Sequence, residues 1–383
     1  MVWEQRKLGD LTQRIKSYPI SHDAEINKIT GTKYIHYGDI HTGKLKRITN
    51  EKILPNINDN NYIPLKSGDV IVADASEDYK GIADACVIDL MKEHYKIVSG
   101  LHTIVFRPNE KLKSDFLYTY LHTSIFKHYG YRVGTGLKVF GISYNNLSNM
   151  KIKLPKIDEQ NKVDKIINIV TNLVTLQQRK VNNYFQYKTQ LINTIFENKN
   201  WQMIKLKDVL SVPKKELANV TTKSQIMTVK LNLGGIVDGA NRDTLNPSAT
   251  KYYIRHAGQF IFGKQNFFNG SMAIVPKAMD EKVTSQDVPA LNINNEKINS
   301  KFLLYYLSRK NFYKHTERFA TGTGSKRLHV DTLLNLKIRI PDISYQNQIV
   351  STLTLLDKKL QLETAKLNKL KQLKQFLLQN MFI

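Results

Sequence analysis

The two halves of this 383-residue sequence repeat each other, and the repeat constrains the fold more than any other feature. Similar blocks recur in the same order: residues 3–10 with 201–208, 62–71 with 252–261, 116–121 with 302–307, 134–138 with 322–326, 149–155 with 335–341 and 160–161 with 346–347. The numbering offset shrinks from the first block to the last, so the second copy is shorter in its early part. Chance similarity rarely preserves so many blocks in one order, so the sequence predicts two copies of one domain.

Each copy has the same order of predicted elements. Short runs of β-type residues come first, such as 69–72 and 102–106. A helix follows, with Ser114 as its predicted N-cap and Gly130 as its stop, and Ser300 is the N-cap in the second copy. A glycine-rich loop, a short strand ending at Pro155 or Pro341, and a long helix complete each copy. This order predicts an α+β chain with two similar α/β domains.

Two segments without Pro or Gly, 159–198 and 344–383, predict two long helices. Forty helical residues extend for about 60 Å. Mostly apolar residues recur in both at alternating spacings of three and four, which is typical of a coiled coil and predicts that the helices pair with each other. The central positions of this stripe, called the seam below, are Val174, Gln177, Val181, Tyr184, Lys188, Leu191, Leu360, Glu363, Leu367, Leu370, Lys374 and Leu377. The predicted boundaries are 1–155 and 200–341 for the domains, and 156–199 and 342–383 for the helices.

The charge of the chain points to a polyanionic partner. There are 57 Lys and Arg residues against 33 Asp and Glu residues, a formal net charge of +24. Such an excess repels itself and is tolerated best beside phosphates, so nucleic acid is the predicted partner, although a solvated basic surface would have the same charge. Charge alone does not separate a reader of duplex DNA from an RNA-binding adaptor. A coiled-coil scaffold without nucleic acid would leave the charge unexplained.

A self-sufficient nuclease or methyltransferase is the alternative from the enzyme class. Asp69 and the Asp-Tyr-Lys of residues 78–80 superficially fit a metal-dependent nuclease, but the second copy has Gln259 in place of Asp69, which favours a structural turn. Asn246-Pro247 lacks the second proline and the aromatic residue of an adenine methyltransferase motif. Dinucleotide-binding and ATP-binding glycine loops are absent from the sequence. We therefore predict neither a catalytic nor a metal site.

Cysteine content and hydropathy indicate the compartment. Cys86 is the only cysteine, so the chain forms no internal disulfide, and its apolar neighbours predict a small core residue. The N-terminus is charged, and no apolar run approaches the roughly 18 residues needed to span a bilayer. We expect a cytoplasmic protein without membrane contact.

The glycine-rich loops are the best candidates for contact with DNA. They combine backbone N–H groups, hydroxyls and cations, a combination that binds phosphate and positions a protein on the duplex; a tight structural turn is the alternative. Base-reading residues should lie where the copies diverge, and residues 264–266 are the candidate there, with a solvated loop as the alternative. The predicted DNA-binding residues are Thr135, Lys138, Thr323, Lys326, Arg327, Lys264 and Asn266.

In this order, the parts resemble the specificity subunits of type I restriction–modification systems over essentially the whole chain. The resemblance rests on the opening tryptophan pattern, the Gly-Thr-Gly loops at 134–136 and 322–324, the strand ends at 152–155 and 338–341, and the glutamine before each long helix. The first copy keeps the family's Glu-Gln pair at 159–160. The second copy has Tyr345 before Gln346, a departure that affects capping more than recognition.

The resemblance implies a non-catalytic subunit in a system that defends against foreign DNA. Each repeat would be a target-recognition domain for one half of a bipartite site on double-stranded DNA. The long helices would pair antiparallel, set the distance between the half-sites and bind two modification (methyltransferase) subunits, and restriction subunits would complete the nuclease. S-adenosylmethionine, ATP and magnesium would belong to those partners, with no cofactor in this chain.

The polar seam positions predict one register for antiparallel helices. Charges without partners are costly in a dry seam, so each should face a partner. Placing residue i opposite residue 551 − i puts Lys188 against Glu363 and Gln177 against Lys374. The alternative is that these side chains lie at the edge of the seam and reach water.

Overall fold

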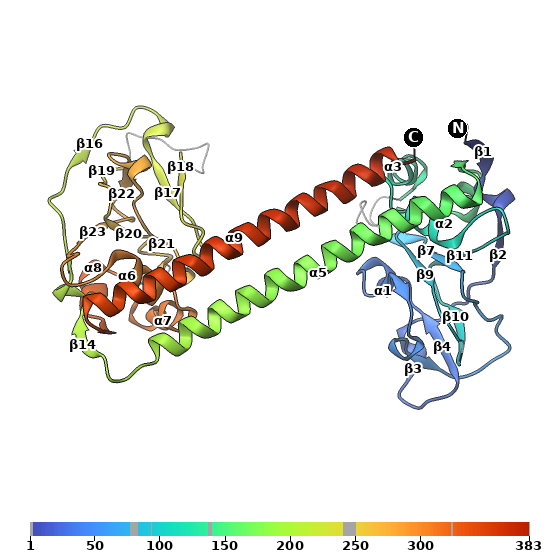
Figure 1. Ribbon diagram of the computed structural model, residues 1–383, viewed down its shortest axis with the longest axis horizontal. Helices are drawn as coiled ribbons and strands as arrows, with labels where there is room; N and C mark the ends of the chain where they lie inside the picture. Colours follow the sequence, from blue (N-terminus) through green and yellow to red (C-terminus); the bar gives the residue numbers. More distant parts are fainter. Residues whose placement is uncertain are drawn as a thin grey trace. The chain divides into compact units, whose positions relative to one another are not determined.

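The chain folds into two compact units. The computed structural model describes residues 3–76, 83–92, 94–136, 140–239, 250–322 and 325–382 (Figure 1). Unit 1 comprises Met1–Gln178 and Ala365–Ile383, and unit 2 comprises Arg179–Thr364. Each unit therefore holds one copy of the repeat and a part of both long helices, α5 (Ile157–Phe196) and α9 (Ile343–Asn380).

Unit 1 is built around a five-stranded sheet with the order β2-β11-β7-β9-β5. A four-stranded sheet, β10-β4-β6-β3, and the pairs β1-β13 and β12-β8 complete it. The strands are β1 (Glu4–Lys7), β2 (Thr12–Ile15), β3 (Glu25–Ile26), β4 (Thr32–Ile35), β5 (Arg47–Ile48), β6 (Asn56–Ile57), β7 (Val70–Ala73), β8 (Ala75–Ser76), β9 (Ala85–Ile88), β10 (Lys96–Ser99), β11 (Thr103–Pro108), β12 (Phe140–Gly141) and β13 (Lys151–Leu154). The short helices are α1 (Tyr37–His41), α2 (Ser114–Tyr120), α3 (Ser124–Val133) and α4 (Tyr144–Ser148).

Unit 2 has a four-stranded sheet, β15-β23-β20-β21, a three-stranded sheet, β16-β19-β22, and the pairs β14-β24 and β17-β18. The strands are β14 (Gln202–Lys205), β15 (Leu210–Ser211), β16 (Leu217–Ala218), β17 (Met227–Val229), β18 (Ile236–Asp238), β19 (Tyr252–Ile254), β20 (Phe260–Phe262), β21 (Met272–Ile274), β22 (Val283–Ser285), β23 (Ala290–Ile293) and β24 (Lys337–Ile340). The short α-helices are α6 (Ser300–Leu307), α7 (Lys310–His315) and α8 (Val330–Leu334).

The central strands keep the same register in both repeats. In unit 1, β11 lies between β2 and β7, and in unit 2, β23 lies between β15 and β20. Val70 of β7 pairs with Phe106 of β11, and Phe260 of β20 pairs with Leu291 of β23. Val70 therefore corresponds to Phe260, and Phe106 corresponds to Leu291. The internal repeat predicted from the sequence is confirmed at the level of strand pairing.

The predicted helix caps need correction. The single helix predicted from Ser114 to Gly130 is wrong, because Thr123 caps a second helix, α3, and so separates it from α2. Ser300 is not the cap of α6. The side chain of Asn299 accepts the first N–H groups of that helix instead, a role for which asparagine is as suitable as serine.

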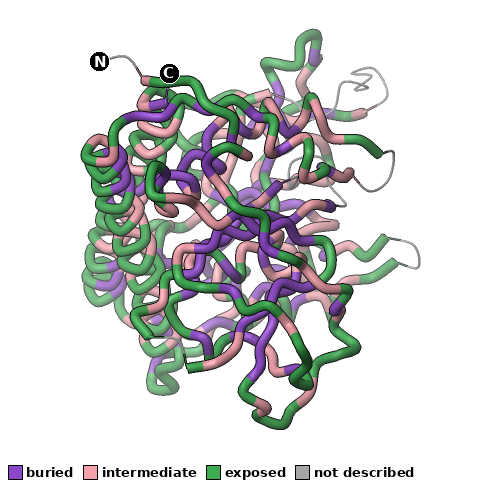
Figure 2. Tube along the Cα trace, turned by 90° about the vertical axis from the view of Figure 1, so that its right-hand side faces the viewer, coloured by how far each residue is buried: buried purple, intermediate pink, exposed green. Residues whose placement is uncertain are grey.

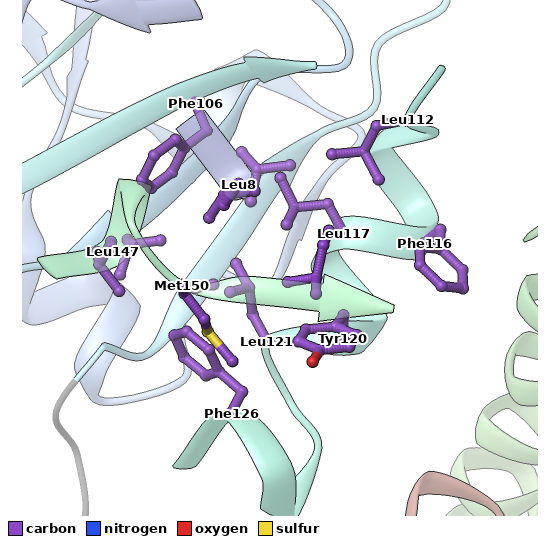
Figure 3. Close-up of a cluster of buried hydrophobic side chains, with 14 of the residues drawn as sticks. Leu8, Phe106, Leu112, Phe116, Leu117, Tyr120, Leu121, Phe126, Leu147 and Met150 are labelled. Carbon is purple, nitrogen blue, oxygen red and sulfur yellow. The ribbon is translucent and has the colours of Figure 1, made fainter. Parts of the chain in front are cut away.

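Apolar side chains from strands and helices meet in a core in each repeat. In unit 1, Leu8, Phe106, Phe116, Leu117 and Phe126 are completely buried together (Figure 3). Burial of each such side chain contributes about 1.5–3 kcal/mol. Figure 2 shows the strands largely buried, while the long helices alternate between exposed and half-buried positions. The repeats are thus ordinary globular domains, whereas the helices bury only one stripe.

The last aromatic residue of each long helix enters a domain core. Phe382, just after α9, lies 5.3 Å from Phe116 and 6.3 Å from Trp3 between ring centroids, in unit 1. Phe196, the last residue of α5, lies 5.1 Å from Phe302 in unit 2. Phe196 and Phe382 are equivalent positions of the repeat, and both are almost completely buried. Neither residue was predicted from the sequence.

One buried glutamine attaches each long helix to its domain. Gln346 accepts the N–H of Asn299 at 2.9 Å and donates to the carbonyls of Lys297 at 3.2 Å and Pro341 at 2.9 Å. Gln160, its equivalent in the first repeat, makes the same three bonds to backbone atoms of Lys113, Lys111 and Pro155. Both glutamines are completely buried. This network explains the glutamine that follows each strand end.

Replacing Gln346 with leucine is expected to lower the free energy of unfolding of unit 2 by about 2–4 kcal/mol, because three buried backbone groups lose their partners. The measurement is urea unfolding followed by circular dichroism. Gln348→Leu is the matched control, since Gln348 is exposed on the same helix, and should change stability by no more than about 0.5 kcal/mol. Equal effects of the two substitutions would contradict the anchoring role.

A buried carboxyl lies between α5 and the first domain. Asp164 is only 6% exposed and accepts a hydrogen bond from the Thr119 hydroxyl at 3.2 Å. Burial, and next the negative charge of Asp115, raises the pKa of Asp164 to about 7, while Thr119 and the guanidinium of Arg47 oppose that rise. Arg47 is itself paired with Asp115 at 2.7 Å. The folded chain therefore favours the neutral form of Asp164.

We expect Asp164→Asn to stabilise unit 1 at pH 8 and not at pH 5. The folded pKa lies above the unfolded value, so the stability contributed by the neutral carboxyl is complete at acid pH and is lost as the pH rises through about 7. Asparagine stays neutral, and the difference at pH 8 should be about 1–3 kcal/mol. Urea unfolding at both pH values measures it, with the exposed Asp158→Asn as control. A variant that is less stable than the parent at pH 8 would contradict the assignment.

The two long helices pack antiparallel within each unit. In unit 2, Lys188 pairs with Asp357 and Lys180 lies 3.2 Å from Glu363. In unit 1, Lys371 donates to Gln178 at 3.2 Å. All twelve seam positions named above are buried or half-buried, and most of the residues between them are exposed. The predicted antiparallel coiled coil is confirmed.

The predicted partners in the register of this coiled coil are wrong in unit 2. Lys188 bonds to Asp357 and not to its predicted partner Glu363, and Asp357 also accepts the Tyr305 hydroxyl at 2.5 Å. The predicted pairing of Gln177 with Lys374 belonged to the same register. Glu363, with 1% of its side chain exposed, is met by Lys180 and, at 3.4 Å, by Lys359. Lys188 and Glu363 are thus each paired with oppositely charged side chains from positions beside the seam.

Candidate nucleic-acid interface

The glycine-rich loop of the second repeat is closed by backbone hydrogen bonds. The N–H of Thr321 donates to Arg327 at 3.0 Å, and the N–H of Arg327 donates back at 2.8 Å. Gly322 has φ +124°, and a Cβ there would lie 2.5 Å from the carbonyl oxygen of Ser325, so this turn requires glycine. Thr323 lies outside the described residues. The loop is thus a tight turn, and contact between this loop and phosphate stays a prediction.

The predicted cations of this loop are accessible. Lys326 lies 2.9 Å from Glu317, and Arg327 lies 3.7 Å from Asp287. The side chains of Lys326 and Arg327 remain 55% and 41% exposed. Surface pairs of this kind contribute little to stability and exchange readily for other anions, so both cations can reach a phosphate.

The first repeat closes its loop in the same way. Thr135 and Gly141 exchange two backbone hydrogen bonds, at 3.0 and 2.8 Å. Thr135 is exposed, and Gly136 has φ +134°. Lys138 lies outside the described residues. Both repeats therefore present a loop of one closed form at the same place in the fold.

Each closed loop is attached to the end of a central strand. After the loop, Ile142 donates its N–H to the carbonyl of Asp74, and Leu328 donates its N–H to that of Lys264, both at 2.8 Å. Lys264 in turn donates its own N–H to Asp287 at 2.8 Å. The structure thus places the backbone of Lys264 beside Leu328, the residue that follows Arg327, although Lys264 and Arg327 lie far apart in the sequence.

Asn266 has a role within the protein. It is half-buried, and its side-chain oxygen accepts from Asn269 at 3.2 Å. Its backbone carbonyl accepts the N–H groups of Asn269 at 3.0 Å and Ser271 at 2.9 Å. These bonds hold the turn after β20, so Asn266 shapes the loop beside Lys264.

A basic cavity of about 300 Å³ opens beside Lys264 in unit 2. Its lining includes Lys214, Lys215, Arg255 and Gln286, with Asp331 as the one acidic residue among the described lining residues. Arg255 is 7% exposed, and burial lowers its pKa to about 10, which leaves it charged at neutral pH. Apart from Lys264, these lining residues were not predicted from the sequence. The Lys-Lys pair directly after Pro213 was the visible signal.

Two hydrogen bonds hold Arg255 in the lining of the cavity. It donates to the Thr284 hydroxyl at 2.7 Å and to the carbonyl of Val288 at 3.0 Å. Both partners are neutral, so the positive charge of the guanidinium is not cancelled by them. A fixed buried cation with neighbouring lysines makes the cavity a site for anionic or acceptor-rich groups.

The carboxylate considered for a nuclease has a structural role. Asp69 is completely buried, accepts the N–H of Lys66 at 2.8 Å and binds Arg107 at 2.8 and 2.7 Å. At the equivalent place in unit 2, Gln259 accepts the N–H of His256 and donates to Asn292, both at 2.9 Å. An ion pair in one repeat thus replaces an amide pair in the other, and Asp69 belongs to a structural turn, as predicted.

The other candidate catalytic residues form no catalytic site within the part of the chain that the structure describes. Residues 78–80 and 246–247 lie outside the described residues. Cys86 is buried, and burial raises the pKa of its thiol, as expected of a core residue. Within the described ranges, no group of three His, Cys, Asp or Glu side chains is arranged to hold a metal. Among the helices in those ranges, none has the length and hydropathy to cross a membrane.

Comparison with known proteins agrees with this architecture. A family model for the type I restriction modification DNA specificity domain matches the chain twice, at residues 2–183 and 198–372. The type I restriction enzyme MjaVIII specificity subunit of Methanocaldococcus jannaschii is 23% identical over 400 residues, covering 94% of this chain and 87% of that protein. The two family matches meet near the end of α5, where the second repeat begins.

Solved structures show the same fold. The S subunit of a type I restriction–modification system from M. genitalium superposes with a TM-score of 0.58 at 12% identity, covering 100% of this chain and 96% of the other. A chain from work on the complex assembly and conformational transition of the type I R-M system gives 0.59 at 15% identity, covering 98% and 96%. The HsdS subunit from Thermoanaerobacter tengcongensis gives 0.50 at 16%, covering 99% and 96%.

Proposed function

Because the chain belongs to the type I restriction–modification DNA specificity family, whose members recognise DNA sequence and are not themselves catalytic, we propose that its two repeats read two different half-sites. The observation that carries this proposal is the pair of closed glycine loops. Each lies at the same place in its repeat and is attached to the equivalent strand end, but the side chains around the two loops differ. Two domains that have the same backbone arrangement but different side chains are suited to recognising two different DNA sequences.

The loops and the basic cavity supply the contact with duplex DNA in this proposal. Thr135, Lys326 and Arg327 are exposed on or beside closed loops, where phosphate contact would set the position of each domain. Lys214 and Lys215 extend this basic surface in unit 2. The net charge of +24 supports binding to a polyanion, and cytoplasmic DNA is the proposed target.

The long helices are proposed to set the distance between half-sites and to bind two modification subunits. With 40 and 38 residues, α5 and α9 are stiff spacers. Beside the seam, α5 exposes an apolar row with helical spacing: Ile166, Ile169, Leu173 and Leu176. Such a row favours packing against helices of a partner. Restriction subunits would join this complex, and S-adenosylmethionine, ATP and magnesium would bind to the partner subunits.

Methylation mapping tests the proposal. Cells that contain this chain and its modification subunit should methylate a site made of two different short sequences separated by a constant number of base pairs. The purified chain with magnesium and S-adenosylmethionine should neither cleave nor methylate the same DNA. A single uninterrupted site, a variable spacing, or turnover by the purified chain would overturn the proposal.

Replacing Lys326 and Arg327 together with alanine is expected to weaken DNA binding similarly on all sequences. Loss of two phosphate contacts should lower the slope of log affinity against log salt by about 2. Affinity titrations of the assembled complex between about 50 and about 200 mM salt measure this slope. Lys301→Ala, at an exposed lysine of α6 outside the loop, is the control. A change in preference at one base pair without loss of affinity would show that these residues read bases instead.

A further inference from the structure

Asp74 and Lys264 occupy the same place in the two repeats. Asp74 follows β7 and Lys264 follows β20, each at the same distance along the chain from the equivalent residues Val70 and Phe260. The N–H of Asp74 donates to the carbonyl of His102 at 3.0 Å, and that of Lys264 donates to the carbonyl of Asp287 at 2.8 Å. The carbonyls of Asp74 and Lys264 both accept, at 2.8 Å, the N–H of the residue that follows the closed loop. Two backbone bonds therefore place both side chains equivalently beside the loops.

The charges at these equivalent positions are inverted. In unit 1, the Asp74 carboxylate lies 3.2 Å from Nδ1 of His102. In unit 2, a lysine stands in place of the aspartate, and the acidic Asp287 stands in place of the histidine. The backbone hydrogen bonds are the same in both repeats. The acidic residue, however, follows β7 in unit 1, whereas in unit 2 it occupies the position equivalent to His102.

The difference between Asp74 and Lys264 is unlike the difference between Asp69 and Gln259, the buried residues just before β7 and β20. Asp69 and Gln259, which pair with Arg107 and Asn292, also differ between the repeats, but both are almost completely buried. The side chains of Asp74 and His102 are 30% and 48% exposed. Lys264 is half-buried, and among the residues that the structure describes its ammonium has no hydrogen-bond or ion-pair partner. These side chains can therefore engage a group outside the protein.

We infer that Asp74 and Lys264 are equivalent base-reading positions, and that their opposite chemistry makes the two half-sites differ. The Asp74 carboxylate accepts hydrogen bonds, so it selects a base with an amino group at the groove edge, cytosine N4 or adenine N6. The Lys264 ammonium donates, so it selects guanine through O6 and N7. This inference rests on the proposed function, since it names residues within the two proposed readers.

The surroundings of Lys264 support this role. It lines the basic cavity together with Lys214 and Lys215, which would hold the DNA backbone nearby. The guanidinium of Arg327 lies 3.7 Å from the Asp287 carboxylate. Lys264 thus lines the basic cavity and is bonded through its carbonyl to the residue that follows the closed loop.

The test measures methylation by the complex of this chain with its modification subunits on a DNA library randomised at both half-sites. Lys264→Ala should lose about 5- to 150-fold discrimination at one base pair of the second half-site, the fold-change of one specific base contact, with the first half-site unchanged. Asp74→Asn should do the same in the first half-site alone. Lys264→Arg should retain the preference for guanine, and Lys277→Ala, at an exposed lysine, should retain every preference.

A double substitution tests whether the preferred base changes to the expected one. The double variant Lys264→Asp with Asp287→His copies the pair of the first repeat into the second. It should change the preferred base at that one position from guanine to the base that the first half-site prefers at the equivalent position. Thermal unfolding of each variant shows whether it is folded. If Asp74→Asn does not fold, the Lys264 variants alone test the inference.

The failures of this inference and of the proposed function are distinguishable. If the unmodified complex shows no bipartite methylation, the proposed function is wrong. If the unmodified complex methylates a bipartite site, but Lys264→Ala leaves every base preference intact or weakens methylation equally on all sequences, Lys264 does not read bases and the inference is overturned.

Discussion

Replacing Phe382 with alanine is expected to destabilise unit 1 by about 3–5 kcal/mol, the usual cost of removing a phenylalanine from a core. Phe382 is 1% exposed and contacts three aromatic rings of the first domain, those of Trp3, Phe116 and Tyr120. Its loss leaves a cavity and removes the anchor that holds the end of α9 on this domain. The helix should then fray from its C-terminal end.

Phe376→Ala is the matched control for this prediction. Phe376 lies on the same helix, and its side chain is 59% exposed, so the same change should cost less than about 1 kcal/mol. Phe196→Ala is the counterpart in unit 2 and should resemble Phe382→Ala, because Phe196 meets the equivalent aromatic residues. Urea unfolding and amide hydrogen exchange of α2 measure these effects. Equal destabilisation by Phe382→Ala and Phe376→Ala would contradict the anchoring.

Exchange of residues 1–155 for the first domain of another family member is expected to change one half-site completely and leave the other unchanged. The junction is favourable because Gln160, just beyond it, bonds only to backbone atoms of the domain. Any domain with the same local backbone can accept these bonds. Methylation mapping of the chimaera with its modification subunit reads both half-sites in one experiment.

The design of this exchange follows from the packing of the helix ends. The donor domain must keep aromatic residues at the positions of Trp3, Phe116 and Tyr120, because these receive Phe382. It should also keep a hydrogen-bond donor in place of Thr119, which binds Asp164 of α5. The reciprocal exchange of 200–341 is the control and should change the other half-site. Loss of both specificities by a folded chimaera would show that the domains do not read independently.

The sequence predicted only some of the residues in the candidate nucleic-acid interface. The glycine loops were found because both copies contain them, and Gly322 is required by its positive φ and by the nearby Ser325 carbonyl. The basic cavity was missed, because its cations come from loops far apart in the chain. Arg255 in particular resembles any charged strand residue until its burial is known.

The sequence by itself determined the features that repeat or that have a short period. Six recurring blocks identify two copies of a domain, and apolar positions at alternating spacings of three and four identify two long helices and the positions that face each other. These signals are local, because the period of a helix restricts which side chains share one face. The family resemblance rests on the same local blocks.

Only the tertiary structure decided which residues become partners. The heptad stripe is compatible with several registers, and the one formed depends on Asp357 and Lys180 beside the seam, and on Tyr305 from another element. Phe382 and Trp3 are at opposite ends of the sequence, and no local pattern connects them. The inverted chemistry of Asp74 and Lys264 is recognised only once backbone bonds place both beside a closed loop. Such pairings are set by packing and hydrogen bonding across the fold, which a one-dimensional pattern does not contain.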